Sequence, residues 1–377
     1  MRKEKINSQF VLLYAIGITL VVGGHISTRN YLNLFSNFFP TYSFHLALFA
    51  FCSGYFYKAE NENVIGTYIL KKFKKTIIPL YFWNIMYGLF VQITRIKQFK
   101  IGGDLTLYNI FISPLKSTHQ FIYNLATWFL VPLFIIEVFN VIIRKITKRL
   151  NINDYIYFII YLLLGVFSVY LAYNGYRTGW FLLIDRTLYL LPFYGLGTLY
   201  RSKLEKRDTL NNYLYFIIIL SIDLILITLN NGAIDFTPSW CNDYTNNYLM
   251  PFIVGVLAIA FWLRISRILS PIASNSQIVK LVGTNTFPIM VHQFFGFFVV
   301  KCFFAIGSKF IPIFNSFNWN RFKTDIWYYY IPKGLKQWLI IYALAGIFIP
   351  ILINFILKKI FSKNKKFKFL DGILYQC

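Results

Sequence analysis

The chain of 377 residues is 57% hydrophobic and 20% aromatic, with a mean hydropathy of +0.54 and only 14% charged residues. A soluble domain of this length needs a larger charged surface, so the composition excludes a protein that is surrounded by water alone. The net charge of +24 fits either nucleic-acid binding or basic loops beside an anionic membrane, and the positions of the charges decide between them.

Apolar stretches long enough to span a bilayer recur along the whole chain, since a membrane helix needs about 20 mostly apolar residues. About ten stretches meet this requirement, near 10–28, 38–57, 76–95, 123–143, 155–173, 181–200, 213–230, 248–266, 282–306 and 337–357. They predict an all-α fold, a polytopic transmembrane helical bundle. Neither a linker nor an internal repeat divides the sequence, so we expect a single integral membrane domain over residues 1–377.

The basic residues alternate with the apolar stretches. If the N-terminus is cytoplasmic, the inner segments hold most of the 38 lysine and arginine residues, near 2–5, 58–75, 144–149, 201–207, 264–280 and 358–368. This is the positive-inside pattern. It excludes nucleic acid as a partner, favours the lipid bilayer, and with an even number of helices predicts that both termini are cytoplasmic.

Three longer connections then lie outside, near 96–122, 231–247 and 307–336, and they are polar and aromatic. They form either a lid or acceptor surface, or ordinary loops along the membrane interface.

The sequence contains no pattern typical of a resident metal or cofactor. Its four cysteines have neither metal-binding nor redox spacing, so we expect no metal site. Gly-rich phosphate loops are also missing from the sequence, which gives no support to a tightly bound nucleotide.

Histidine is scarce, with only His25, His45, His119 and His292, and an ionisable group in a bilayer is a functional candidate. His25 and His45 are about equally far from a short loop centred near residue 35. In an antiparallel hairpin they should lie at similar depth, near the outer ends of their helices. They act as a base and an orienting partner, or they cap polar helix ends.

Five segments resemble acyltransferase family 3, in order and with its spacing. They are the segment from Phe10 to His25; Phe44-His-Leu-Ala-Leu-Phe-Ala-Phe-Cys-Ser-Gly-Tyr55; Lys71-Lys-Phe-Lys-Lys-Thr-Ile-Ile-Pro-Leu80; Trp128-Phe-Leu130; and Leu281-Val-Gly-Thr-Asn-Thr-Phe-Pro-Ile-Met-Val-His292. The resemblance implies transfer of an acyl group, often acetyl from acetyl-CoA, to a sugar hydroxyl of a surface polysaccharide or its lipid-linked precursor. It also implies that His25 is catalytic.

The chain departs from this family at Tyr14, where the pattern has an arginine eleven residues before the histidine. Tyr14 and His25 share one helix face, but a tyrosine cannot offer the charged fork of an arginine. Either a basic residue from another helix supplies the charge, or the usual chemistry has been lost. Lys71, Lys72, Lys74 and Lys75 stand where arginine is usual, and we expect them to hold the phosphates of acyl-CoA together with Trp128.

Acyl transfer requires donors for an oxyanion and a base that is correctly oriented. Ser53 is the first candidate donor, unless its small side chain only allows helices to pack. Glu137 is expected to lie buried in the pore and to orient a histidine. Asp185 and Arg186 are expected to form a local ion pair.

An integral membrane O-acyltransferase in a bacterial cell membrane is therefore the leading hypothesis. A transporter of a lipid-linked sugar or polysaccharide is the alternative, because Tyr14 replaces the arginine. A polysaccharide polymerase is less favoured, because its outer loops are usually larger.

Overall fold

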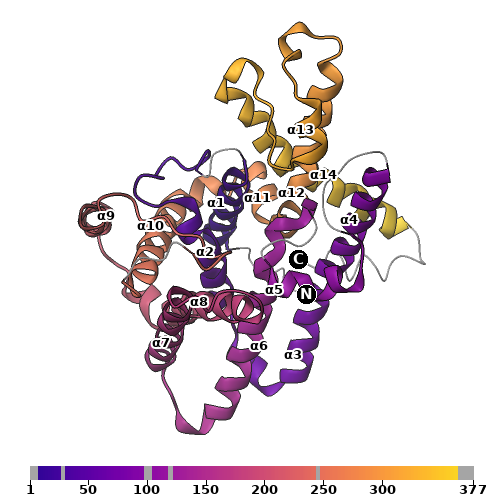
Figure 1. Ribbon diagram of the computed structural model, residues 1–377. Helices are drawn as coiled ribbons and strands as arrows, with labels where there is room; N and C mark the ends of the chain where they lie inside the picture. Colours follow the sequence, from indigo (N-terminus) through magenta and orange to yellow (C-terminus); the bar gives the residue numbers. More distant parts are fainter. Residues whose placement is uncertain (1–6, 27–29, 97–103, 118–121, 243–246, 364–377) are drawn as a thin grey trace.

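The computed structural model describes residues 7–26, 30–96, 104–117, 122–242 and 247–363, and these are mostly helical (Figure 1). The principal helices are α1 (Ser8–Gly24), α2 (Thr41–Tyr55), α3 (Ile65–Lys72), α4 (Ile78–Ile96), α6 (Leu130–Ile146), α7 (Asp154–Tyr173), α8 (Trp180–Leu199), α9 (Asn212–Leu229), α10 (Met250–Ala273), α12 (Thr286–Gly307) and α14 (Leu339–Lys363). Each of the ten predicted stretches overlaps one of them, which confirms the predicted helical bundle.

Shorter helices connect these elements. They are η1 (Ala59–Asn63), η2 (Phe73–Ile77), η3 (Tyr108–Ile112), α5 (Ser113–Lys116), η4 (Ile122–Phe129), η5 (Thr147–Leu150), η6 (Tyr200–Leu204), η7 (Glu205–Arg207), α11 (Gln277–Gly283), η8 (Pro312–Phe314), α13 (Trp319–Thr324), η9 (Pro332–Gly334) and η10 (Lys336–Trp338). The π-helical turn η2 ends two residues before Pro79, which cannot donate a backbone hydrogen bond to Lys75.

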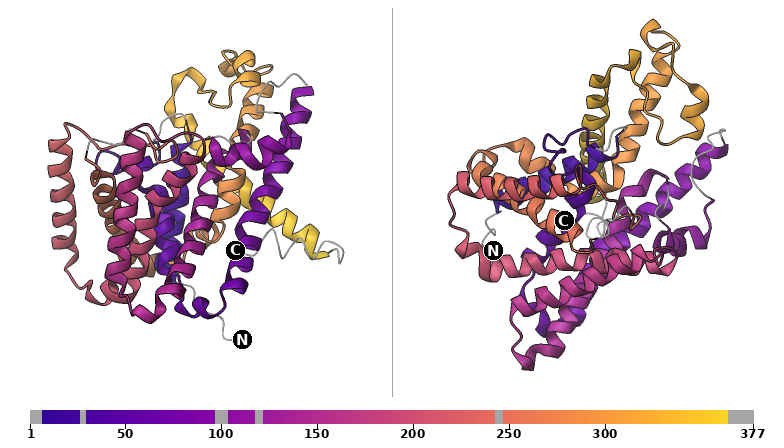
Figure 2. Two further views of the ribbon diagram at one scale, coloured as in Figure 1. Left: turned by 60° about the horizontal axis from the view of Figure 1, so that its bottom comes forward. Right: turned by 60° about the vertical axis from the view of Figure 1, so that its left-hand side comes forward.

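Among the described residues, seven helical runs are long and apolar enough to cross a membrane. They are built on α3–α4, α6, α7, α9, α10, α12 and α14. The helices lie side by side in Figure 2, and α9 packs at one edge of the bundle with most of its apolar side chains exposed. The protein is therefore a multi-pass membrane protein.

Helix α1 is the centre of the fold and contacts α2, α10, α11, α12 and α14. It has 17 residues and α2 has 15, so α1 extends for only about 26 Å and is shorter than the hydrocarbon core of a bilayer. Helix α1 ends at Gly24 and α2 begins at Thr41. Beside these two helix ends lies a cavity whose walls other segments of the chain complete.

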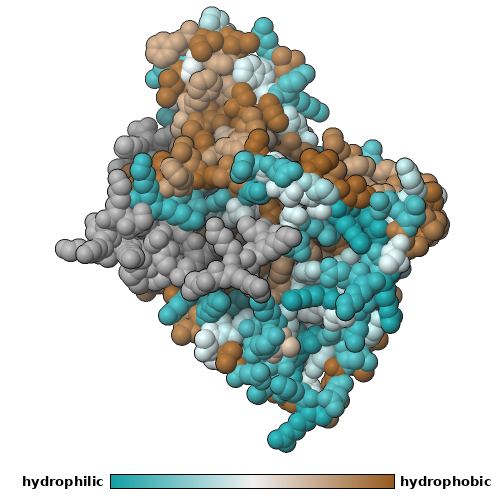
Figure 3. All heavy atoms as spheres, turned by 180° about the vertical axis from the view of Figure 1, so that it is seen from behind, coloured by the Kyte–Doolittle hydropathy of each residue, from teal (hydrophilic) through white to brown (hydrophobic). Residues whose placement is uncertain are grey.

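Basic connections meet at the opposite end of the bundle. Lys148 donates to Asn63 at 3.2 Å, Arg201 donates to the carbonyl of Tyr57 at 3.1 Å, and Arg264 pairs with Asp208. In Figure 3 hydrophilic side chains gather over the lower half of the molecule, whereas the projection at the top mixes hydrophobic and hydrophilic ones. Four of the basic segments that the sequence predicts on one side of the membrane are thus at one end of the fold.

Candidate active site

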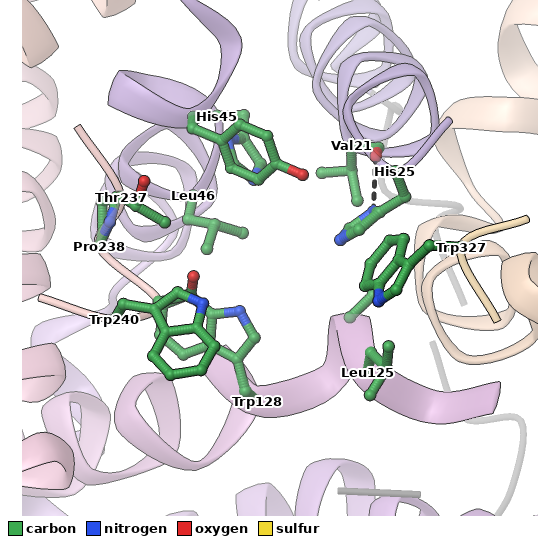
Figure 4. Close-up of a pocket in the computed structure, with 13 residues that line it drawn as sticks. Val21, His25, His45, Leu46, Leu125, Trp128, Thr237, Pro238, Trp240 and Trp327 are labelled. Carbon is green, nitrogen blue, oxygen red and sulfur yellow. Dashed lines mark hydrogen bonds between the residues drawn. The ribbon is translucent and has the colours of Figure 1, made fainter. Parts of the chain in front are cut away.

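An outer cavity of about 130 Å³ lies where α1 ends and α2 begins, and both His25 and His45 line it (Figure 4). The hairpin argument for equal depth is thereby confirmed. Tyr42 lies between the two imidazoles, with its ring edge-on to both, and donates its hydroxyl to the carbonyl of Gly24 at 2.8 Å.

Hydrogen bonding fixes the tautomer of both histidines. Nδ1 of His25 is 2.8 Å from the carbonyl oxygen of Val21 and 3.2 Å from Oε1 of Gln293. Nδ1 of His45 is 2.6 Å from the carbonyl oxygen of Thr41. Since these partners are acceptors, each Nδ1 carries the proton in the neutral ring. Each Nε2 then has a lone pair and can accept a proton.

Aromatic side chains from separate parts of the chain form the walls of this cavity. Trp128 comes from η4, Trp240 from the connection before α10, and Trp327 from the connection after α12 (Figure 4). Two of the three outer connections therefore contribute to the site, as the lid or acceptor-surface hypothesis requires. A cavity with apolar walls and a few placed polar atoms is the usual form of a small-molecule site.

Arg186 contacts two of the segments that form these walls. Its guanidinium lies 4.5 Å from the ring centroid of Trp128 and donates to the carbonyl of Ser239, the neighbour of Trp240. The predicted ion pair with Asp185 is wrong, because among the described residues the Asp185 carboxylate has no hydrogen-bond partner, and Arg186 contacts other segments.

A second, cationic pocket of about 480 Å³ lies at the opposite end of α1. Ser53, Lys71, Lys72 and Lys75 line it, together with Tyr14. Lys74 is exposed and does not line it. The pocket thus collects three of the four lysines expected to bind phosphate groups.

Glu137 of α6 connects the residues of the cationic pocket. Its carboxylate accepts a hydrogen bond from Ser53 at 2.6 Å and pairs with Lys72 at 2.5 Å. The expectation that Glu137 orients a histidine is therefore wrong, because its carboxylate is engaged by a hydroxyl and an ammonium.

Tyr14 stands where the resemblance places an arginine, and lysines from other helical segments line the same pocket. Lys71, Lys72 and Lys75 line the same pocket as its side chain. Of the two accounts of the missing arginine, this arrangement fits the one in which another helix supplies the positive charge.

The structure divides the predicted site residues into two groups. His25, His45 and Trp128 line the outer cavity, whereas Ser53 and the lysines lie at the cationic pocket. Trp128 is thus not placed with the lysines that were expected to share its role. Tyr14 and His25 are eleven residues apart on one helix, which is about 16 Å along its axis.

Two other histidines lie outside this arrangement. His292 is buried and shares a 2.6 Å hydrogen bond with the hydroxyl of Tyr87, while its ring lies edge-on to Trp83. Its neighbour Gln293 is the residue that contacts His25. His119 lies outside the described residues.

Sequence reasoning missed Gln293, Tyr42 and Trp240, and it gave Arg186 only a local ion pair rather than its contacts at the cavity wall. Gln293 had a usable signal, since it is a buried polar residue directly after the His292 motif. Trp240 had only its place in a polar, aromatic outer connection. The pairing of Arg186 with Trp128 depends on the packing of distant helices, which the sequence does not display.

The fold defines the class of protein as a multi-pass helical membrane protein with an outer histidine cavity and a cationic pocket at the opposite end. A family model described as an acyltransferase domain matches residues 12–294, which is most of the chain. The chain belongs to acyltransferase family 3, and it is an acyltransferase. No curated protein and no solved structure matches it.

Proposed function

We propose that this protein transfers an acyl group, most simply acetyl, from acyl-CoA to a sugar hydroxyl. The acceptor belongs to a cell-surface polysaccharide or its lipid-linked precursor, and the protein acts in a bacterial cell membrane. The observation that carries the proposal is the orientation of His25, whose proton is held on Nδ1 while Nε2 is left as a base in an outward, aromatic-walled cavity.

The chemistry follows from that base. A sugar hydroxyl is a weak nucleophile, and Nε2 of His25 accepts its proton as the oxygen attacks the thioester carbonyl. A C–O bond forms, the C–S bond breaks, and the coenzyme A thiolate leaves and is protonated. His45 presents a second imidazole to the same cavity, and its Nε2 lone pair can accept a hydrogen bond from the acceptor hydroxyl.

The donor fits the cationic pocket. Phosphate groups of acyl-CoA are anionic, and Lys71, Lys72 and Lys75 supply positive charge at its wall. The linings of the two cavities share no residue, so the proposal requires the acyl-bearing arm to open a passage along α1. An extended coenzyme A arm is long enough to follow three helical turns.

Acyl transfer is tested by the O-acetyl content of the surface polysaccharide. We compare cells that lack the gene, cells that carry it, and cells that carry His25→Ala at equal protein level. Loss of O-acetyl in the null strain, restored by the intact gene alone, is expected. Removal of a general base typically lowers the rate by ~10²–10⁴-fold. Equal O-acetyl levels in all three strains would contradict the proposal.

A transporter of a lipid-linked sugar is the alternative left open by the sequence, and the match to an acyltransferase domain over residues 12–294 favours the enzyme over it. Acyl-CoA dependence separates the two functions. Purified protein that moves labelled acetyl from acetyl-CoA to polysaccharide is an enzyme, whereas precursor that accumulates on the inner leaflet of null cells indicates transport.

A further inference from the structure

Lys301 is a buried charge that the proposed chemistry does not use. It lies on α12 with 3% of its surface exposed, and its ammonium donates to the carbonyl of Ile326. The same ammonium is 4.6 Å from the ring centroid of Tyr329. Burying an ammonium is costly unless it finds such partners, so the segment that supplies them is tied to α12.

That segment, Asp325 to Tyr330, is held along most of its length. Asp325 pairs with Arg321 at 2.9 Å and accepts a hydrogen bond from the backbone N–H of Trp327 at 2.8 Å. The Tyr328 hydroxyl accepts a hydrogen bond from the backbone N–H of Asn318 at 2.8 Å. The backbone N–H of Tyr330 donates to the Tyr342 hydroxyl at 3.1 Å. Tyr329 connects the segment to α1, since its hydroxyl donates to the backbone carbonyl of His25 at 2.5 Å. This hydrogen bond therefore holds the segment in a fixed position relative to His25 of the outer cavity.

Trp327 is the side chain that this segment presents to the cavity. It is 45% exposed, its ring lies edge-on to Phe294, and it stands across the cavity from Trp240 (Figure 4). An indole face is flat and polarisable, and it stacks well against the C–H face of a sugar ring. Because the backbone that carries Trp327 is held in place, the space between its indole and His25 limits which sugar ring can bind there.

The segment also lies beyond the family match, which ends at residue 294 and includes both histidines. We propose that residues 325–330 are the acceptor-selecting wall of the outer cavity, with Trp327 stacking on a sugar ring of the acceptor and Lys301 as the positioning residue. This inference depends on the proposed acyl transfer, because it names which part of that site chooses the acceptor.

The test is the steady-state kinetics of purified protein with acetyl-CoA and with chemically de-O-acetylated surface polysaccharide from the host cells. Trp327→Ala is expected to raise the KM for polysaccharide by about tenfold or more, the scale of losing one central aromatic contact. Its KM for acetyl-CoA and its kcat at saturating polysaccharide should stay within about twofold of wild type.

Trp319→Ala is the matched control. Trp319 lies in the same outer connection and is 38% exposed, but it packs against Phe317 and Phe322 and does not line the cavity. Its substitution should leave the KM for polysaccharide unchanged. An equal rise for both tryptophan variants would reveal a general effect on the connection and would overturn the inference.

Lys301→Met tests the positioning role. It keeps the aliphatic stem and removes the ammonium, so it should raise the KM for polysaccharide without changing the KM for acetyl-CoA, and Lys301→Arg should restore much of the loss. Active Trp327→Ala enzyme with a wild-type KM for polysaccharide would overturn the inference alone. Wild-type protein without acetyl transfer would overturn the proposed function as well.

Discussion

The ion pair between Lys72 and Glu137 is asymmetric, since the lysine side chain is 31% exposed and the carboxylate side chain only 5%. Water can solvate Lys72 when its partner is removed. A charged Glu137 has no such access, and among the described residues the hydrogen bond from Ser53 is the one that it would keep. Breaking a buried pair is costly mainly because of the charge that stays behind, so the two single substitutions should differ in effect.

We predict that Lys72→Met destabilises the protein more than Glu137→Gln. The first leaves a buried carboxylate without its cation, at a cost of about 2 kcal/mol after allowance for partial exposure. The second keeps an oxygen that accepts from Ser53 and should cost less than about 1 kcal/mol. Unfolding midpoints of the detergent-purified variants measure the difference, and the reverse order would refute this account of the pair.

The same contact shows what the sequence could predict at this scale and what it could not. Equal distances from one short loop placed His25 and His45 together, because a hairpin fixes relative depth. Ser53 and Glu137 are separated by 84 residues, and their contact depends on which faces of α2 and α6 meet. Helix periodicity describes a face but does not identify its neighbour, so the two groups of site residues could not be separated in advance.

Helix positions were predictable for a different reason. A bilayer requires every backbone polar group to be satisfied within a helix, so apolar length alone predicts the element. Helix ends were harder to predict where polar residues continue the helix. Helix α10, for example, extends to Ala273, whereas the apolar stretch predicted an end near residue 266. The short α11 and α13 were not predicted, since neither has the length of a membrane span.

Packing between α2 and α8 depends on two glycines in close contact with backbone. A methyl group at Gly54 would collide with the carbonyl of Tyr194, and one at Gly197 would collide with the carbonyl of Phe51. Small residues let membrane helices approach closely, and here the glycine beside Ser53 has that role. The Ser53 hydroxyl bonds to Glu137 instead, so packing alone does not account for this serine.

Gly197→Ala should therefore destabilise the protein by about 1–3 kcal/mol, the usual cost of overpacking a tight contact. Gly66→Ala is the control, because Gly66 lies in helix α3 with open space around it. There the methyl group should stabilise the protein by up to about 1 kcal/mol through higher helix propensity. Thermal unfolding of both variants gives the comparison, and similar midpoints would contradict the packing argument.

At the scale of the whole molecule, the two ends of the bundle differ in chemistry. One end gathers the basic connections and the lysine pocket, and the other gathers the histidines and the tryptophan walls. Acyl-CoA is made in the cytoplasm and surface glycans are modified outside it, so the proposed function requires the basic end to face inward. The positive-inside pattern of the sequence gives the same orientation.

Helix α7 offers a direct test of that orientation, since exposed residues stand at its two ends. Lys148 precedes it at the basic end and Asn174 follows it at the opposite end. In a cysteine-free variant, a membrane-impermeant maleimide should label Asn174→Cys in intact cells and Lys148→Cys only after permeabilisation. Labelling of Lys148→Cys in intact cells would place the cationic pocket outside. Cytoplasmic acyl-CoA could not then reach its lysines, and the assignment of that pocket to the donor would fail together with the orientation.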